Sequence, residues 1–183
     1  MDKKQARRAG LQARAALSLD MRKEYGKRIF QKLIPNLDTV HIIGCYISVN
    51  DEVDTHSILQ YAYMKGITVT VPVIYERTLH FYTIGEDTKF GTGIGGIPEP
   101  MTGTVIKPDE IDLMIVPLSS FDDHCMRTGY GKGYYDSILS KCRNTVGLAY
   151  SVQHVDLIRA DPWDVALERI ITEVEIFSSN KTF

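Results

Sequence analysis

The pattern of apolar and polar positions changes from a helical period near the start of the chain to short β-branched runs further on. Residues 2–16 are strong helix formers, interrupted only by Gly10. Ser18 is placed to cap a second helix, and Pro35 is expected to end it. The buried stripe of this second helix recurs every four residues: Tyr25, Ile29 and Leu33.

The apolar runs that follow are separated by turn and capping residues. They predict buried strands over residues 39–47, 68–73, 79–83, 113–117, 145–150 and 169–172. A helix is expected from Asp54-Thr55 to Lys65, where Gly66 stops it, and another over residues 134–142. Strands that alternate with helices predict an α/β fold in a single domain, residues 1–183. We expect a mainly parallel twisted sheet with helices on both faces, as in a Rossmann-like three-layer sandwich.

This topology predicts where a site would lie. Ligands of open parallel sheets bind beyond the carboxyl ends of the strands. Residues 47–52 and 72–75 follow two such ends, and a long loop follows strand 113–117, so we expect these segments to line one crevice. The basic N-terminal helices are expected to fold over the same edge. Residues 90–100 are rich in Gly and Pro and predict a loop rather than a domain linker.

Composition narrows the classes of function. The chain has 183 residues, 44% of them hydrophobic, and a net charge of −2, so it has no overall basic field for nucleic acid. No run of 18 apolar residues predicts a membrane span, and the first residues lack the apolar core of a signal peptide. Three cysteines without a C-x-x-C pair are expected to stay reduced, which indicates a cytoplasmic protein.

Residues 127–136 are the most informative segment, with the sequence Arg-Thr-Gly-Tyr-Gly-Lys-Gly-Tyr-Tyr-Asp. Three glycines at alternate positions leave a backbone that can point successive N–H groups at an anion. Arg127 and Lys132 add cations, and Asp136 is placed to hold a metal ion, so the segment predicts a polyphosphate site. It lacks the order of residues of a P-loop or a dinucleotide fingerprint. The structural alternative is a flexible surface turn, which would need neither the cations nor the acid.

These residues resemble the 5-formyltetrahydrofolate cyclo-ligase family, and the resemblance covers nearly the whole chain. The family signature Arg-x-Gly-x-Gly-x-Gly-Tyr-Tyr-Asp is matched without a gap from Arg127 to Asp136. Weaker matches follow the family's order: Lys3 and Arg7, residues 51–55, Ile97-Pro98-Glu99-Pro100, residues 115–117, Phe121-Asp122, and Asp164 ahead of residues 170–173.

The resemblance implies an enzyme that uses ATP and Mg²⁺ to cyclise 5-formyltetrahydrofolate to 5,10-methenyltetrahydrofolate, with release of ADP and phosphate. Its partners would be these two small molecules, with neither nucleic acid nor membrane, and we expect a monomer. Two alternatives stay open: a non-catalytic relative that binds folate or nucleotide, and an ATP-dependent enzyme of the same fold that acts on another formyl or amide substrate.

The resemblance also implies a role for individual residues. Catalysis would fall to Arg127 and Lys132, and the metal to Asp136 and Asp164. The expected ATP-binding residues are Lys3, Lys4, Gln5, Ala6, Arg7, Arg127, Thr128, Gly129, Tyr130, Gly131, Lys132, Gly133, Tyr134 and Tyr135. The expected substrate-binding residues are Ile47, Glu52, Tyr130, Gly131, Lys132, Gly133 and Tyr134.

Each charged residue also has a purely structural interpretation. Lys3 and Arg7 would form a solvated helix face, Arg127 an ion pair, and Asp136 and Glu52 the acids of helix first turns. The chain departs from the family pattern at two places. Gly95-Gly96 stands where some relatives place Trp, so Phe81, Phe90 or Phe121 is expected to supply stacking surface, and Trp163 stands where relatives often carry His.

Overall fold

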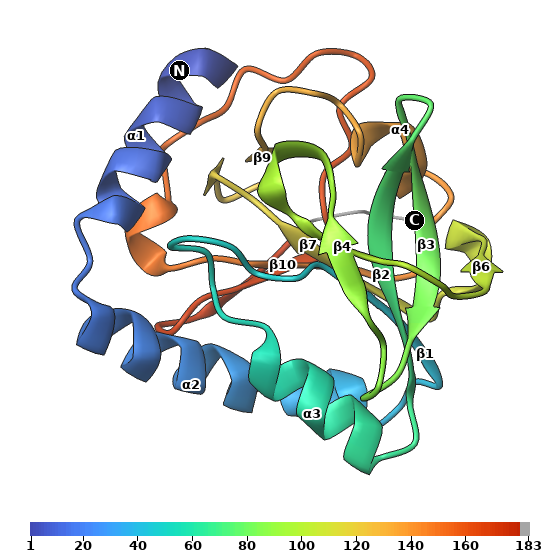
Figure 1. Ribbon diagram of the computed structural model, residues 1–183. Helices are drawn as coiled ribbons and strands as arrows, with labels where there is room; N and C mark the ends of the chain where they lie inside the picture. Colours follow the sequence, from blue (N-terminus) through green and yellow to red (C-terminus); the bar gives the residue numbers. More distant parts are fainter. Residues whose placement is uncertain (180–183) are drawn as a thin grey trace.

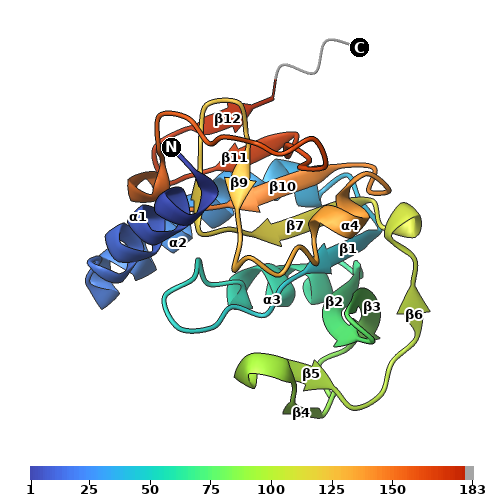
Figure 2. The same ribbon diagram turned by 90° about the horizontal axis from the view of Figure 1, so that it is seen from above.

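The computed structural model describes residues 1–179, and an eight-stranded mixed sheet runs through its centre (Figures 1 and 2). Its strand order is β12-β11-β10-β7-β1-β2-β3-β6. The strands are β1 Ile42–Cys45, β2 Thr68–Tyr75, β3 Thr78–Ile84, β6 Val105–Ile106, β7 Leu113–Pro117, β10 Thr145–Leu148, β11 Arg169–Ile171 and β12 Ile176–Ser178. The five strands from β11 to β2 are parallel, whereas β12, β3 and β6 are antiparallel additions at the edges. The predicted α/β fold with a mainly parallel sheet is confirmed; the predicted domain continues to residue 183, outside the described residues.

One face of the sheet is covered by two amphipathic helices, α2 (Leu19–Leu37) and α3 (His56–Met64), seen at the bottom of Figure 1. The hydroxyl of Ser18 caps α2 by accepting a hydrogen bond from the backbone N–H of Met21 at 3.2 Å. The helices bury an apolar stripe against the strands, made up of Ile29, Leu33, Leu37, Ile58 and Ala62.

The opposite face carries a second apolar core but lacks long helices among the described residues. Helix α4 (Asp136–Leu139) is four residues long, much shorter than the helix predicted over residues 134–142. Irregular chain and side chains such as Phe121 complete the cover over Met114 and Val116 of β7. Helices are therefore found on both faces, as expected, but the helix on this face is only one turn long. The Rossmann-like description stays a prediction.

Two further local predictions were wrong. Pro35 does not end α2, which continues to Leu37, because the hydrogen bond that proline cannot donate falls in the last turn of the helix. The segment over residues 90–100 is a hairpin rather than a loop: β4 (Phe90–Thr92) pairs with β5 (Pro98–Pro100). Gly95 and Gly96 turn its tip with φ of +74° and +80°.

Helix α1 (Lys3–Ala15) lies at the carboxyl edge of the sheet instead of on a face. It packs against the small hairpin of β8 (Ser120–Phe121) and β9 (Arg127–Thr128) and against the 3₁₀ turn Ser151–Gln153. Gly10 makes this contact possible, because a Cβ there would lie 2.1 Å from the carbonyl oxygen of Ser119. The glycine that interrupts the helical sequence is thus a packing contact.

This contact predicts that Gly10→Ala destabilises the protein although alanine favours a helix. Backbone has to move to admit the methyl group, so we expect a net loss of about 1–2 kcal/mol in the free energy of unfolding, measured by urea denaturation. Gly26→Ala in α2 is the matched control, since a Cβ there meets nothing within 4 Å. The control is expected to gain roughly 0.5–1 kcal/mol. Equal effects of the two substitutions would contradict the close-packing account.

Candidate active site

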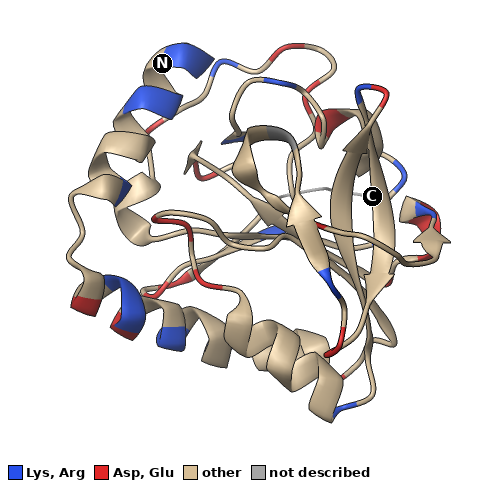
Figure 3. Ribbon diagram, in the orientation of Figure 1, with Lys and Arg blue, Asp and Glu red and all other residues tan. Residues whose placement is uncertain are grey.

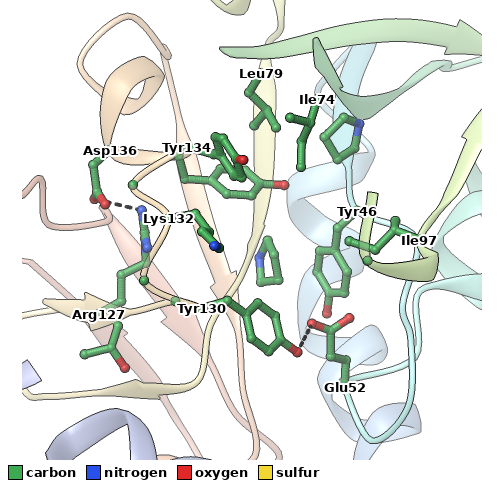
Figure 4. A pocket seen from close by; sticks show the side chains of 18 of the residues that line it. Tyr46, Glu52, Ile74, Leu79, Ile97, Arg127, Tyr130, Lys132, Tyr134 and Asp136 are labelled. Atoms are coloured by element: carbon green, nitrogen blue, oxygen red, sulfur yellow. Dashed lines mark hydrogen bonds and ion pairs between the residues drawn. The ribbon is translucent and has the colours of Figure 1, made fainter. Parts of the chain in front are cut away.

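A cavity of about 860 Å³ opens at the carboxyl edge of the parallel strands. The segment after β1, the end of β2, the glycine-rich loop after β9 and α1 all contribute to its wall, as the strand order predicts. The tip of the β4–β5 hairpin adds Gly95 and Ile97. Figure 4 shows side chains from these segments facing one another across the cavity.

The glycine-rich loop, residues 129–133, has glycine at every second position. Gly131 and Gly133 have φ of +84° and +71°, a region that other L-residues rarely adopt. Helix α1 contacts the loop, because Nε of Arg7 donates a hydrogen bond to the carbonyl oxygen of Gly129. Lys132 is exposed and its side chain extends into the cavity (Figure 4). The loop therefore presents backbone, the ammonium group of Lys132 and the phenol of Tyr130 to the cavity.

Arg127, in strand β9 directly before this loop, is a nearly buried cation, 8% exposed. Its Nη2 donates to Oδ1 of Asp136 at 2.9 Å, and its guanidinium lies 5.8 Å from the ring centre of Tyr135. Burial lowers the pKa of Arg127, and the carboxylate of Asp136 opposes that effect. Its Nε has no hydrogen-bond partner within residues 1–179. A buried cation with spare donor capacity is suited to an anionic ligand.

A second ion-pair group lies where α1 meets the segment before β11. Nζ of Lys3 lies 2.5 Å from Asp161 and 2.7 Å from Asp164. Burial disfavours the ammonium ion, but hydrogen bonds to both carboxylates outweigh it and raise the pKa of Lys3. Trp163, between these acids, lines the cavity and is 69% exposed. Figure 3 shows the basic residues spaced along α1 beside this region.

The far end of the cavity holds a carboxylate, Glu52, on the turn after β1. The phenol of Tyr130 donates to its Oε1 at 2.9 Å, and the backbone N–H of Val49 donates to its Oε2 at 3.0 Å. Burial raises the pKa of Glu52, while these two hydrogen bonds oppose the shift. Asn50, with φ of +55°, turns the chain so that Glu52 reaches the cavity.

Apolar side chains line the space between the two ends: Tyr46, Ile47, Ile74, Leu79, Ile97 and Tyr134. The expectation that Phe81, Phe90 or Phe121 would supply stacking surface was wrong. Phe81 and Phe121 are fully buried in the second core, and Phe90 lies on β4 away from the lining. Tyr46 was missed, although it follows β1 directly, next to Ile47, and the carboxyl-end rule applies to it equally.

Not all predicted residues of the N-terminal helix reach the cavity. Lys3 and Arg7 line it, being one helical turn apart. Lys4 and Gln5 are exposed outside the lining, and the side chain of Gln5 completes a capping box with Asp2. Ala6 is fully buried in a small core with Val155 and Ile158. In the glycine-rich segment, every predicted residue from Arg127 to Asp136 lines the cavity.

The two carboxylates predicted to bind metal, Asp136 and Asp164, both line the cavity. Oδ1 of Asp136 accepts a hydrogen bond from Arg127, whereas both carboxylate oxygens of Asp164 accept hydrogen bonds from Lys3. Within the described part of the chain, no cluster of three or more His, Cys, Asp or Glu could enclose a metal. A site with one free carboxylate oxygen suits a metal that takes few protein ligands and many from phosphate and water, as Mg²⁺ does.

Fold and site together define the class: an α/β protein with one cavity that has a cationic, glycine-lined end and an apolar end closed by a carboxylate. None of the helices in the described residues combines the length and apolar character that a membrane span needs.

Comparison with known proteins assigns the family. The model of the 5-formyltetrahydrofolate cyclo-ligase family matches residues 1–173. A 5-formyltetrahydrofolate cyclo-ligase of Mycoplasma pneumoniae is 30% identical, over 94% of this chain and 99% of the relative, and one of Haemophilus influenzae is 33% identical, over 70% and 74%. The solved structure of Aquifex aeolicus 5,10-methenyltetrahydrofolate synthetase aligns with a TM-score of 0.87 at 27% identity, over 99% of this chain and 94% of that one. The chain belongs to the 5-formyltetrahydrofolate cyclo-ligase family and is an enzyme.

Proposed function

We propose that this enzyme closes 5-formyltetrahydrofolate to 5,10-methenyltetrahydrofolate and couples the closure to ATP hydrolysis, with release of ADP and phosphate. The observation that carries the proposal is the two-ended cavity. Cations and a glycine-lined loop lie at one end, Glu52 at the other, and apolar side chains between them. Such a site accommodates a polyphosphate and a planar heterocycle side by side.

The chemistry explains why both substrates have to share one cavity. The N5-formyl group is an amide, so its carbon is a poor electrophile and its oxygen a poor leaving group. Transfer of the γ-phosphoryl group to the formyl oxygen corrects both faults. N10 then attacks the activated carbon and loses its proton, the C–O bond breaks, and phosphate leaves as the ring closes. The intermediate would hydrolyse in water, so an enclosed cavity favours ring closure.

Phosphoryl transfer asks the protein mainly for positioning and for stabilisation of charge. The N–H groups of the glycine-rich loop and the guanidinium of Arg127 would bind the phosphate oxygens. Lys132 has glycine on both sides and no packing role, so its ammonium is free to follow the migrating phosphoryl group. Arg127 is nearly buried, which removes competing water and strengthens its interaction with an anion.

Mg²⁺ fits the donors that the cavity offers. Asp136 would bind it through the carboxylate oxygen that Arg127 leaves free, and Asp164 through exchange of its Lys3 contact. When bound, the metal would neutralise phosphate charge and hold the γ-phosphoryl group in line. Lys3 would then turn from its aspartates to the nucleotide, which joins α1 to the bound substrate.

Glu52 would recognise the pterin. A carboxylate accepts hydrogen bonds from a ring N–H and an exocyclic amino group at once. Its partners Tyr130 and Val49 hold one oxygen each and leave further lone pairs directed at the cavity. Tyr46, Ile74 and Ile97 would enclose the faces of the ring.

Activity is tested by mixing the purified protein with 5-formyltetrahydrofolate and recording the methenyl chromophore. We expect product when ATP and Mg²⁺ are both present, with one ADP formed for each ring closed. Product formed equally well without nucleotide would contradict the proposal. Binding of both substrates without turnover would identify a non-catalytic relative, and turnover of a different formyl compound would identify another substrate.

Lys132→Met is expected to lower kcat by roughly 10²–10³, the usual effect of removing one oriented electrostatic donor. Affinity for Mg-ATP is expected to fall much less, and Trp163 makes this measurable without turnover. It is the single tryptophan of the chain and lines the cavity, so its fluorescence should respond to Mg-ATP. Lys141→Met, at an exposed lysine beyond α4, is the matched control. If both variants stay within a factor of a few of the unmodified enzyme, Lys132 has no catalytic role.

A crossed pair of variants separates the two ends of the cavity. Glu52→Gln removes a charged acceptor and is expected to weaken folate binding by about 1.5–3 kcal/mol while Mg-ATP affinity stays nearly constant. Asp136→Asn is expected to do the reverse and to raise the Mg²⁺ concentration that activity requires. Each ligand is titrated separately against both variants by calorimetry. If Glu52→Gln leaves folate affinity intact and lowers only the melting temperature, Glu52 is a structural acid.

A further inference from the structure

Helix α1 carries a buried arginine, Arg14, that the predicted site does not include. It is 3% exposed and lies 11 residues after Lys3, about 16.5 Å along the helix at 1.5 Å per residue. Lys3 and Arg7 are thus at the phosphate end of the cavity, whereas Arg14 is at the end that holds Glu52. Burying a guanidinium is costly unless its charge and its donors are satisfied by partners.

The partners of Arg14 come from three other segments that meet behind the cavity wall. Its Nη2 lies 2.8 Å from Oδ1 of Asp51 and 3.3 Å from the phenolic oxygen of Tyr130. Its Nη1 donates to the carbonyl oxygen of Leu118 at 3.3 Å, just after β7. Asp51 precedes Glu52, and the phenol of Tyr130 donates to Glu52 itself at 2.9 Å. Arg14 therefore holds both the turn that carries Glu52 and the side chain that orients its carboxylate.

We propose that Arg14 is the positioning residue of the folate-binding end, holding Glu52 in place through Asp51 and Tyr130. This inference rests on the proposed function in so far as Glu52 binds the pterin. The hydroxyl of Tyr130 is the link: because it accepts from Arg14, its single hydrogen is directed at Glu52. Tyr130 also belongs to the glycine-rich loop, so the contact ties the folate end to the phosphate loop.

The charge of Arg14 acts on Glu52 as well. The titratable and charged groups around Glu52 are Asp51, Arg14 and the phenols of Tyr46, Tyr130, Tyr135 and Tyr150, the last of which donates to the backbone carbonyl of Glu52 at 3.4 Å. Burial raises the pKa of all four phenols, so they stay neutral where Glu52 titrates. Burial raises the pKa of Glu52, and Asp51 adds to the rise, whereas Arg14 opposes it. Loss of Arg14 would therefore raise the pKa of Glu52 further.

Arg14→Met is the first test, with folate affinity measured by calorimetry, which needs no turnover. We expect the Kd for 5-formyltetrahydrofolate to rise by about tenfold or more, the effect of losing hydrogen bonds to a charged group. The Kd for Mg-ATP is expected to stay within about twofold, because its contacts are at the other end of the cavity.

The pH dependence of folate binding is the second measurement. Folate binding needs ionised Glu52 and is lost as pH falls through the pKa of Glu52, so the loss should begin at higher pH in Arg14→Met. Arg14→Lys keeps the charge but not the geometry, and should restore the pH dependence more fully than the affinity.

Tyr130→Phe tests the link while it leaves the ion pair of Arg14 with Asp51 in place, and Tyr130 itself is 53% exposed. If Arg14 acts through the phenol, the double variant should lose less folate affinity than the sum of the two single losses. Gln12→Met, at an exposed position of the same helix, controls for general effects on α1.

Should Arg14→Met fold poorly, the folate affinity and the pH profile of Tyr130→Phe decide alone: unchanged values would overturn the inference. Additive losses, or a lower melting temperature with unchanged folate affinity, would also overturn it. A folate-binding protein that forms no methenyl product would refute the proposed reaction and leave this test intact, whereas no folate binding would overturn both.

Discussion

The close contact between α1 and the β8–β9 hairpin is the constraint on which the cavity depends. Gly10 lets the helix axis approach until backbone meets backbone at Ser119. That approach brings Lys3 to Asp164, Arg7 to the glycine-rich loop and Arg14 to the turn of Glu52. Lys3, Arg7 and Arg14 make these contacts from one side of α1, so the geometry of the helix sets the spacing between them. A helix that is first in the sequence thereby closes a site formed by strand ends in the middle of the chain.

Most of the charged side chains at the cavity and behind its wall form ion pairs, and Lys132 and Arg7 add cations beside them. Arg127 pairs with Asp136 and Arg14 with Asp51, while Lys3 pairs with Asp164 and also contacts Asp161. Removing one partner of a buried pair leaves an uncompensated charge, which costs far more than a surface ion pair contributes. The pairs of Arg127 and Lys3 line the cavity, whereas the pair of Arg14 is shielded behind Tyr130. Pairs open to ligand can exchange partners, and the shielded pair keeps the wall in place.

The sequence predicted most of the sheet and the glycine-rich segment, because these features depend on local pattern. The apolar run of β7 matches its predicted range from residue 113 to 117, and Gly131 and Gly133 adopt the left-handed conformation for which glycine is suited. The wrong prediction of the stacking residues and the missed role of Arg14 depend on tertiary contacts. The sequence around Phe121 does not distinguish a ring that stacks on a ligand from a ring in the core. In the structure, Phe121 packs edge-on against Phe177 in the second core. The partners of Arg14 lie 37 to 116 residues away, so no local pattern indicates them.

The paired charges also explain why nucleotide and metal would have to bind together. A phosphate group alone that approached Arg127 would meet Asp136 at 2.9 Å from that cation, and like charge would repel it. A metal ion alone would meet the buried cation of Arg127 in the same way. Under the proposed function, Mg-ATP would bring both charges at once: Arg127 would exchange Asp136 for phosphate oxygens, and Asp136 would exchange Arg127 for the metal. Each charge would keep a partner throughout this exchange, which would avoid the desolvation cost of binding either ion by itself.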